Sequence, residues 1–115
     1  MWTVAPPFPT KSSKYKNRRV KLDGYTFDSQ AEANRYAELK LLERAGKITR
    51  LLLQPLYSFQ INNKVIFTYF ADFQYMNEHG NMVIEDVKGV RTPLYKLKKK
   101  IIEARYDIKI TEVDA

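Results

Sequence analysis

Cysteine is absent from the 115 residues of the chain, and histidine occurs once. The fold therefore contains no disulfide and no thiolate metal site, which fits a reducing compartment. A single histidine also argues against a histidine-rich zinc centre and against a Ser-His-Asp triad. No run of about 18 apolar residues is present, and the N-terminus lacks a charged-then-apolar secretion signal, so we expect neither a membrane span nor export.

Acidic residues are also scarce relative to basic ones. The chain has 13 Asp and Glu residues against 20 Lys and Arg, which gives a net charge of +7 and an isoelectric point near 9.6. In a small domain this balance indicates a polyanionic partner such as nucleic acid, with a merely basic protein as the alternative. Hydrophobic residues make up 44% of the chain, which is enough for one globular core.

The apolar patterns predict one α/β domain over residues 18–115, preceded by a basic, proline-containing extended arm over residues 1–17. A hairpin is predicted around the Asp-Gly turn, helices where caps and a helical period coincide, and strands in the remaining apolar runs. The predicted hairpin covers 20–27, the helices 29–45 and 93–105, and the strands 51–61 (interrupted by Gln54-Pro55), 65–75, 82–88 and 108–113. The nearly continuous apolar character of the second and third strands predicts that both are central and covered on both faces.

Charged residues interrupt the predicted core strands. Asp72 lies within an apolar and aromatic run, and Asp86 and Lys88 lie at the end of the next strand. Because alternate residues of a strand share a face, Asp86 and Lys88 should point together, and Glu85 should point away with Val87. A hairpin between these two strands would make Asp72 and Asp86 neighbours.

Two converging carboxylates with oxygen donors suit Mg²⁺ or Mn²⁺ rather than zinc. Beside such a metal and a phosphate, Lys88 could orient or help to deprotonate an attacking water and stabilise developing charge. A structural ion pair between Asp86 and Lys88 is the alternative, but it leaves Asp72 unexplained.

The run Ala71-Asp72, followed by Asp86-Val87-Lys88, resembles the PD-(D/E)xK nuclease superfamily. The element order over about residues 25–113 is also similar to the αβββαβ core of its restriction-endonuclease-like fold, which implies a mixed central sheet flanked by helices. Ala71 stands where many members have proline, and the second acid is aspartate rather than glutamate; neither change removes a ligand. The run over 27–33 and the pair Gln54-Pro55 resemble small phage endonucleases and archaeal-type Holliday junction resolvases.

The resemblance implies that an acidic residue of the first helix reaches the metal site, and Glu32 is the match by position. Its place on the apolar face of the helix favours an inward side chain. Glu32 is also the acidic member of the capping box that Ser29 begins, so a cap is the alternative. Ser29 and Gln54 are auxiliary candidates near the site, although Gln54 could equally close a strand before Pro55.

Basic residues gather in the arm and around the start of the second helix. Lysine contacts with phosphates give affinity without sequence specificity, whereas many charge runs are only solvated faces. The second group follows the strand that ends at Lys88, so we expect it near the metal. The candidate DNA contacts are Lys14, Lys16, Arg18, Arg19, Arg91, Lys96, Lys98, Lys99 and Lys100.

These features together predict a Mg²⁺-dependent endodeoxyribonuclease with no small-molecule cofactor. Its catalytic residues would be Glu32, Asp72, Asp86 and Lys88, and the three acids would bind the metal. The resemblance favours a Holliday junction resolvase in the cytoplasm of a bacterial or phage-infected cell, acting as a homodimer because junction resolution takes two symmetric cuts. The alternatives are a transposon-type or general phage endonuclease that cuts duplex or flap DNA, and a basic DNA-binding module without catalysis.

Overall fold

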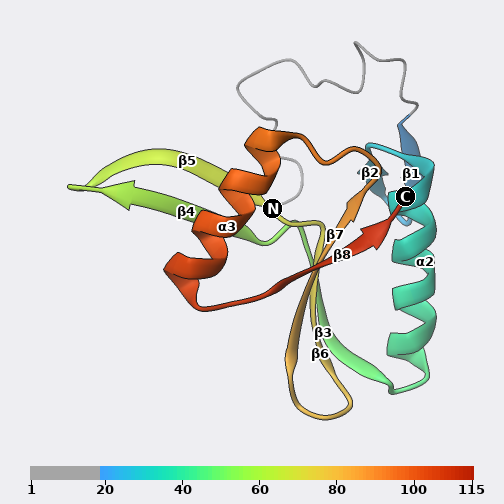
Figure 1. The fold of residues 1–115 in the computed structure, drawn as a ribbon. Helices are drawn as coiled ribbons and strands as arrows, with labels where there is room; N and C mark the ends of the chain where they lie inside the picture. Colours follow the sequence, from blue (N-terminus) through green and yellow to red (C-terminus); the bar gives the residue numbers. More distant parts are fainter. Residues whose placement is uncertain (1–18) are drawn as a thin grey trace.

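Two helices flank a four-stranded mixed sheet in the computed structural model, which describes residues 19–115 (Figure 1). The helices are α2 (Gln30–Arg44) and α3 (Pro93–Tyr106), and the strands are β1 (Val20–Leu22), β2 (Tyr25–Phe27), β3 (Ile48–Leu53), β4 (Leu56–Ile61), β5 (Lys64–Phe70), β6 (Phe73–Asn77), β7 (Met82–Lys88) and β8 (Ile110–Asp114). Within this described part of the chain, no helix is long and apolar enough to cross a membrane.

The central sheet has the strand order β3-β6-β7-β8. Strand β6 pairs antiparallel with both β3 and β7, whereas β7 and β8 are parallel and are connected through α3. A parallel pair requires a long crossover of this kind, because a tight turn reverses the chain direction. Along the sequence, α2, β3, β6, β7, α3 and β8 form the expected αβββαβ order, and the β4–β5 hairpin is inserted between the first two of these strands.

Each face of the sheet packs against one helix (Figure 1). On one face, Leu39 of α2 is fully buried against a cluster that includes Phe73 of β6. On the other face, Ile102 of α3 is buried with Ile84 of β7 and Ile110 of β8. The sheet therefore forms the middle layer of three, and its strand β7 contributes side chains to both cores.

The predicted Asp-Gly hairpin is confirmed. Leu22 of β1 pairs with Tyr25 of β2 across the turn, where Asp23 has a φ of 53° and Gly24 a φ of 81°. Two consecutive residues with positive φ form the turn that matches the twist of a two-residue hairpin, and glycine adopts this conformation without a Cβ clash. The Tyr36 hydroxyl donates to Asp23 Oδ2 at 3.0 Å, which ties the hairpin to α2.

The helix predictions are confirmed to within about one residue. Helix α2 has Ser29 as its N-cap, and Gly46, with a φ of 75°, follows its end. Helix α3 has Thr92 as its N-cap and Pro93 in its first turn, as expected. The strand predicted over 108–113 is present as β8, which begins two residues later and ends one residue later.

The single strand predicted over 65–75 is wrong. The chain bends at Ala71 and Asp72, so the run divides into β5 and β6. The Ala71 amide donates to the Pro55 carbonyl at 3.1 Å, whereas the Asp72 amide donates to the Glu85 carbonyl at 2.9 Å. The chain therefore changes its partner from β4 to β7 at this bend, and Asp72 lies in the bend rather than within a strand.

The predicted strand over 51–61 is also two strands, because Gln54 adopts a φ of 49° before Pro55 and separates β3 from β4. The prediction that this run is central is wrong for β5. Strand β5 pairs with β4 in a hairpin that projects from the sheet beside α3 (Figure 1). Phe70 of β5 is 45% exposed, whereas the adjacent Tyr69, which faces the other side of the strand, is 6% exposed. An apolar run predicts burial but cannot tell that only one face of the strand is covered.

Replacement of Ile102 by alanine should lower the free energy of unfolding by about 2–5 kcal/mol, because it leaves a cavity beneath the sheet. Urea unfolding monitored by circular dichroism measures this loss. Leu97 on the same helix is 55% exposed, so Leu97→Ala is the matched control and should cost less than about 1 kcal/mol. Equal losses in the two variants would contradict the packing of α3 described above.

Candidate active site

Four charged side chains from three parts of the chain come together at the end of β7. Asp72 directly precedes β6, Asp86 and Lys88 lie on β7, and Glu32 lies in the first turn of α2. The Val87 amide donates to Asp72 Oδ2 at 2.6 Å, and Lys88 Nζ lies 3.7 Å from Asp86 Oδ1. The structure thus brings together all four residues that were predicted to be catalytic.

Strand alternation separates the two adjacent carboxylates of β7, as expected. Glu85 points toward α2, where Arg35 donates through Nε and Nη2 to its two carboxylate oxygens at 2.8 and 2.7 Å. The Tyr75 hydroxyl donates to the same carboxylate. Asp86 points to the opposite side, toward Lys88. Glu85 is therefore a neutralised structural residue, and Asp86 is the carboxylate that belongs to the cluster.

Glu32 combines the two interpretations that the sequence left open. The Ser29 hydroxyl accepts a hydrogen bond from the backbone amide of Glu32 at 3.1 Å, which caps α2. The cap uses the amide, so the carboxylate remains available to the cluster. The Glu32 side chain is buried, and its carboxylate lies close enough to Asp72 to shift the pKa of that residue. Ser29 thus acts on the helix end, next to the cluster.

Burial raises the pKa values of all three acids to about 7. For Glu32 desolvation is the main cause. For Asp72 desolvation is followed by the negative charge of Glu32, and for Asp86 it is followed by the negative charge of Asp72. Lys88 lowers the pKa values of Glu32 and Asp86 but does not offset the burial. The charge of Glu32 therefore makes Asp72 harder to ionise, and the charge of Asp72 makes Asp86 harder to ionise, so the cluster favours positive charge.

Two oxygen atoms of the cluster, Glu32 Oε1 and Asp86 Oδ1, are buried without a hydrogen-bond partner. Buried polar atoms are rarely left unpaired, so each one calls for a partner such as a cation or water. Among residues 19–115, however, no group of three or more His, Cys, Asp or Glu side chains is already arranged to hold a metal ion. The donor atoms are those that Mg²⁺ prefers, but their coordination of a metal is a proposal.

Two tyrosines beside the cluster were not predicted from the sequence. The Tyr69 hydroxyl of β5 donates to Asp86 Oδ2, and the Tyr69 ring stacks on that of Tyr95 from α3 at 6.4 Å. Lys88 Nζ lies 4.7 Å from the centre of the Tyr95 ring. The sequence signal for both residues is the apolar spacing of their elements, which identifies a core position and not a hydroxyl aimed at an acid.

The candidate auxiliary residue Gln54 lies beside Asp72, and its backbone amide donates to the Asp72 carbonyl at 2.9 Å. Its backbone therefore supports the bend that presents Asp72. Gln54 directly follows the last residue of β3 and precedes Pro55, so it also closes a strand, as the sequence allowed. Gln54 thus supports the site through main-chain geometry.

The predicted DNA contacts divide into groups. Lys14, Lys16 and Arg18 lie outside the described residues. Arg19 is about half exposed and lies 4.0 Å from Asp28. Arg91 donates to Glu112 and Asp114 at 2.9 and 2.7 Å. Because these two carboxylates already bind its guanidinium, Arg91 is less available to contact a phosphate.

The lysines of α3 point in two directions. A hollow of about 350 Å³ is lined by Lys96, Lys99 and Lys100 together with Arg91, Glu103 and Glu112. Lys96 and Lys100 are exposed, whereas Lys99 lies 3.4 Å from Glu103. Lys98 instead lies over the Phe67 ring of the β4–β5 hairpin at 5.5 Å. Lys96 and Lys100 are therefore the lysines of α3 best placed for an external anion.

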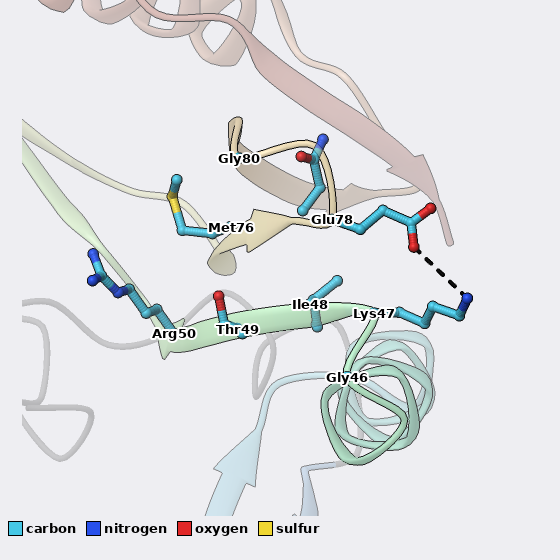
Figure 2. Close-up of a pocket in the computed structure, with 9 residues that line it drawn as sticks. Gly46, Lys47, Ile48, Thr49, Arg50, Met76, Glu78 and Gly80 are labelled. Carbon is cyan, nitrogen blue, oxygen red and sulfur yellow. Dashed lines mark ion pairs between the residues drawn. The ribbon is translucent and has the colours of Figure 1, made fainter.

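A second and larger hollow, of about 460 Å³, lies at the other end of β6 from Asp72 (Figure 2). Lys47 and Arg50 line it on the side of β3, and Lys47 forms an ion pair with Glu78 at 3.8 Å. This hollow contains none of the clustered acids. The larger of the two hollows therefore does not coincide with the cluster.

The fold and the site together define an α/β protein with a cluster of three acids and one lysine at one end of the central strands of a mixed sheet. The chain belongs to DUF1064, a family of proteins of unknown function, whose model matches residues 12–113. Comparisons with curated proteins and with solved structures give no significant match. The family assigns no activity, so the function has to be inferred from the site.

The raised pKa values predict how the metal-free protein responds to pH. Below about pH 4 the three acids are protonated in both the folded and the unfolded chain. As the pH rises, the unfolded chain releases protons first, so stability falls until the pH passes the folded-state pKa values of about 7. Asp72→Asn should weaken this fall, because it removes one titrating group and a charge that raises the pKa of Asp86.

Urea unfolding in a chelator at about pH 4 and about pH 8 measures the effect. The free energy of unfolding of Asp72→Asn, minus that of the unsubstituted chain, should increase with pH. The control is Glu78→Gln, because Glu78 is exposed and lies away from the cluster. The same increase for both variants would show that the effect does not come from the buried acids.

Proposed function

We propose that this protein is a metal-dependent endodeoxyribonuclease whose active site is the cluster of Glu32, Asp72, Asp86 and Lys88. One observation carries the proposal: three carboxylates share a partly buried site with one ammonium group. When all are ionised, two negative charges remain unbalanced. A divalent cation balances this charge, whereas a second lysine or arginine would be expected if the cluster were purely structural.

Glu32, Asp72 and Asp86 would hold Mg²⁺, and Mn²⁺ should substitute, because both cations prefer oxygen ligands. When bound, such a cation lowers the pKa of a coordinated water and stabilises charge on a phosphate. Carboxylates repel one another, so the cation would also draw the three groups together. The buried oxygens Glu32 Oε1 and Asp86 Oδ1 support this assignment, since neither accepts a hydrogen bond.

Lys88 supplies the positive charge of the site. It is the last residue of β7, its side chain is 32% exposed, and its ammonium lies 3.7 Å from Asp86. From there it can donate to a phosphate oxygen that approaches from solvent, or orient the water that attacks the phosphorus. Its contact with the Tyr95 ring limits the directions that the ammonium can take.

The proposed substrate is DNA. The hollow beside Lys96 and Lys100 offers positive charge to a backbone phosphate, and Tyr95 links it to the site: the Tyr95 ring contacts Lys88, and its hydroxyl donates to Glu112 at the hollow. The resemblance favours four-way junctions as the substrate and hence a homodimer with two symmetric active sites. The proposed location is the cytoplasm of a bacterial or phage-infected cell.

Two alternatives follow from the same surface. A transposon-type or general phage endonuclease would use the same chemistry on duplex or flap DNA. A basic DNA-binding module would use the lysines without catalysis, but unneutralised acids beside the lysines would repel phosphates. The buried acids thus favour a nuclease over a simple binding module.

Asp72→Asn should reduce cleavage of a synthetic four-way junction in Mg²⁺ by at least about a thousandfold, because it removes a ligand charge from the metal site. Gel electrophoresis of labelled junctions measures the cleavage, and a binding assay in Ca²⁺ should show unchanged affinity. The control is Asp107→Asn, since Asp107 caps the far end of α3.

Linear duplex and flap DNA, tested in parallel, decide among the substrates. If the unsubstituted protein nicks none of these DNAs with Mg²⁺ or Mn²⁺, the nuclease proposal fails. If it cuts DNA but its mass in solution is that of a monomer both with and without a junction, the nuclease stands and the resolvase assignment fails.

Lys96→Ala and Lys100→Ala should each weaken DNA binding and lower the slope of log affinity against log salt by about one, the contribution of one phosphate contact. Fluorescence anisotropy over a range of salt concentrations measures both. Lys47→Ala is the charge-matched control, because Lys47 is 63% exposed at the far hollow (Figure 2). An equal change for Lys47→Ala would indicate nonspecific attraction by net charge alone.

A further inference from the structure

The two carboxylate oxygens of Asp86 have different surroundings. Oδ2 accepts the hydrogen bond from the Tyr69 hydroxyl, whereas Oδ1 is buried without a hydrogen-bond partner and lies 3.7 Å from Lys88 Nζ. The Asp86 side chain is 1% exposed, so solvent does not fix its orientation. The Tyr69 hydroxyl thus decides which oxygen Asp86 presents to the cluster.

We propose that Tyr69 is a positioning residue that holds Oδ2 of Asp86 and leaves Oδ1 as the single oxygen available to a divalent cation. This inference rests on the proposed function. Without the hydroxyl, the carboxylate could rotate about its last bond or offer both oxygens, and the binding site would be less ordered before the metal arrives. Groups that orient a metal ligand in this way raise the affinity for the metal without touching it.

The Asp72 carboxylate is also held by one hydrogen-bond donor on one of its oxygens. The Val87 amide donates to Asp72 Oδ2 at 2.6 Å, so this oxygen is also occupied by the protein. Two of the three acids therefore have one oxygen that is fixed by a donor and another that is left for the cluster. Single-oxygen ligation suits the compact octahedral shell of Mg²⁺, whereas Ca²⁺ often takes both oxygens of a carboxylate.

Tyr69 is itself fixed by its surroundings. It is 6% exposed and belongs to the buried cluster that contains Ala71, Ile84 and Ile102. Its ring stacks on that of Tyr95 with an interplanar angle of 26°. A hydroxyl at the end of such a packed ring can move little, which is what a positioning group requires.

Tyr57 provides a matched control because its hydroxyl donates away from the cluster. It donates to Gln74 Oε1 at 2.9 Å, and its ring packs against that of Tyr106. Tyr69→Phe and Tyr57→Phe each remove one hydroxyl oxygen from a packed aromatic pair and keep both rings. Only the first removes the donor to Asp86.

The test measures Mn²⁺ binding by electron paramagnetic resonance, without DNA, on the full chain. Tyr69→Phe should bind Mn²⁺ about 10 to 100 times more weakly than the unsubstituted protein, the range expected when a group that orients a ligand is lost. Tyr57→Phe should bind Mn²⁺ as the unsubstituted protein does, because the Tyr57 hydroxyl donates to Gln74. Equal affinity for Tyr69→Phe and the unsubstituted chain, or an equal loss in both variants, would overturn the proposal.

Cleavage kinetics distinguish a positioning role from a merely structural one, because only a positioning role changes the dependence of the rate on Mn²⁺ concentration. For Tyr69→Phe the Mn²⁺ concentration that gives half-maximal cleavage should rise, and the rate at saturating Mn²⁺ should return toward the unsubstituted value. Asp86→Asn should show no such rescue. A rate for Tyr69→Phe that stays low at saturating Mn²⁺ would contradict a positioning role.

A measurement on the unsubstituted chain covers the case in which Tyr69→Phe does not fold. Mn²⁺ should broaden the ring NMR signals of Tyr69 at lower concentration than those of Tyr106, which packs at the far end of α3 against Tyr57. Equal broadening would overturn the inference. If the unsubstituted chain binds Mn²⁺ and cuts DNA but Tyr69→Phe is unchanged, only this inference fails; if the unsubstituted chain binds no Mn²⁺, the proposed function and the inference fail together.

Discussion

A buried negative charge needs a positive partner, and strand β7 shows the two ways in which this protein meets that need. Glu85 and Asp86 are adjacent and both almost fully buried. Glu85 has a guanidinium of its own, held by Arg35 with two hydrogen bonds. Asp86 shares one lysine with two other acids. The first carboxylate is neutralised within the fold, and the second lies in a cluster in which three acids face one lysine.

Several long-range contacts are required to build that cluster. The bend at Asp72 exists because the chain leaves β4 and joins β7 there. The inserted β4–β5 hairpin carries Tyr69, so a segment outside the αβββαβ core contributes a donor to Asp86. Helix α2 brings in Glu32 by its first turn, and the Ser29 cap fixes the start of that turn. The insertion is therefore part of the site and not only an appendage to the sheet.

The sequence predicted the acids and lysine of the cluster because each breaks a local rule. A charged residue in an apolar run stands out, and strand alternation then separates Asp86 from Glu85. For Glu32 the local pattern fits both a helix cap and an inward carboxylate. The structure shows that both descriptions hold, since the cap uses the backbone amide and leaves the side chain to the cluster. The local pattern identified the residue, but it could not tell that the backbone amide takes part in the cap while the side chain joins the cluster.

What the sequence could not predict depends on partners that are distant along the chain. Tyr69 is one of several aromatic residues in an apolar run, and only the packing of β5 against β7 and α3 brings its hydroxyl to an acid. Arg91 looked equivalent to the lysines that follow it, but the parallel pairing of β7 with β8 places Glu112 and Asp114 on its guanidinium. A cluster of like charges in the sequence is thus sorted by tertiary contacts into charges that stabilise the fold and charges that remain available to a ligand.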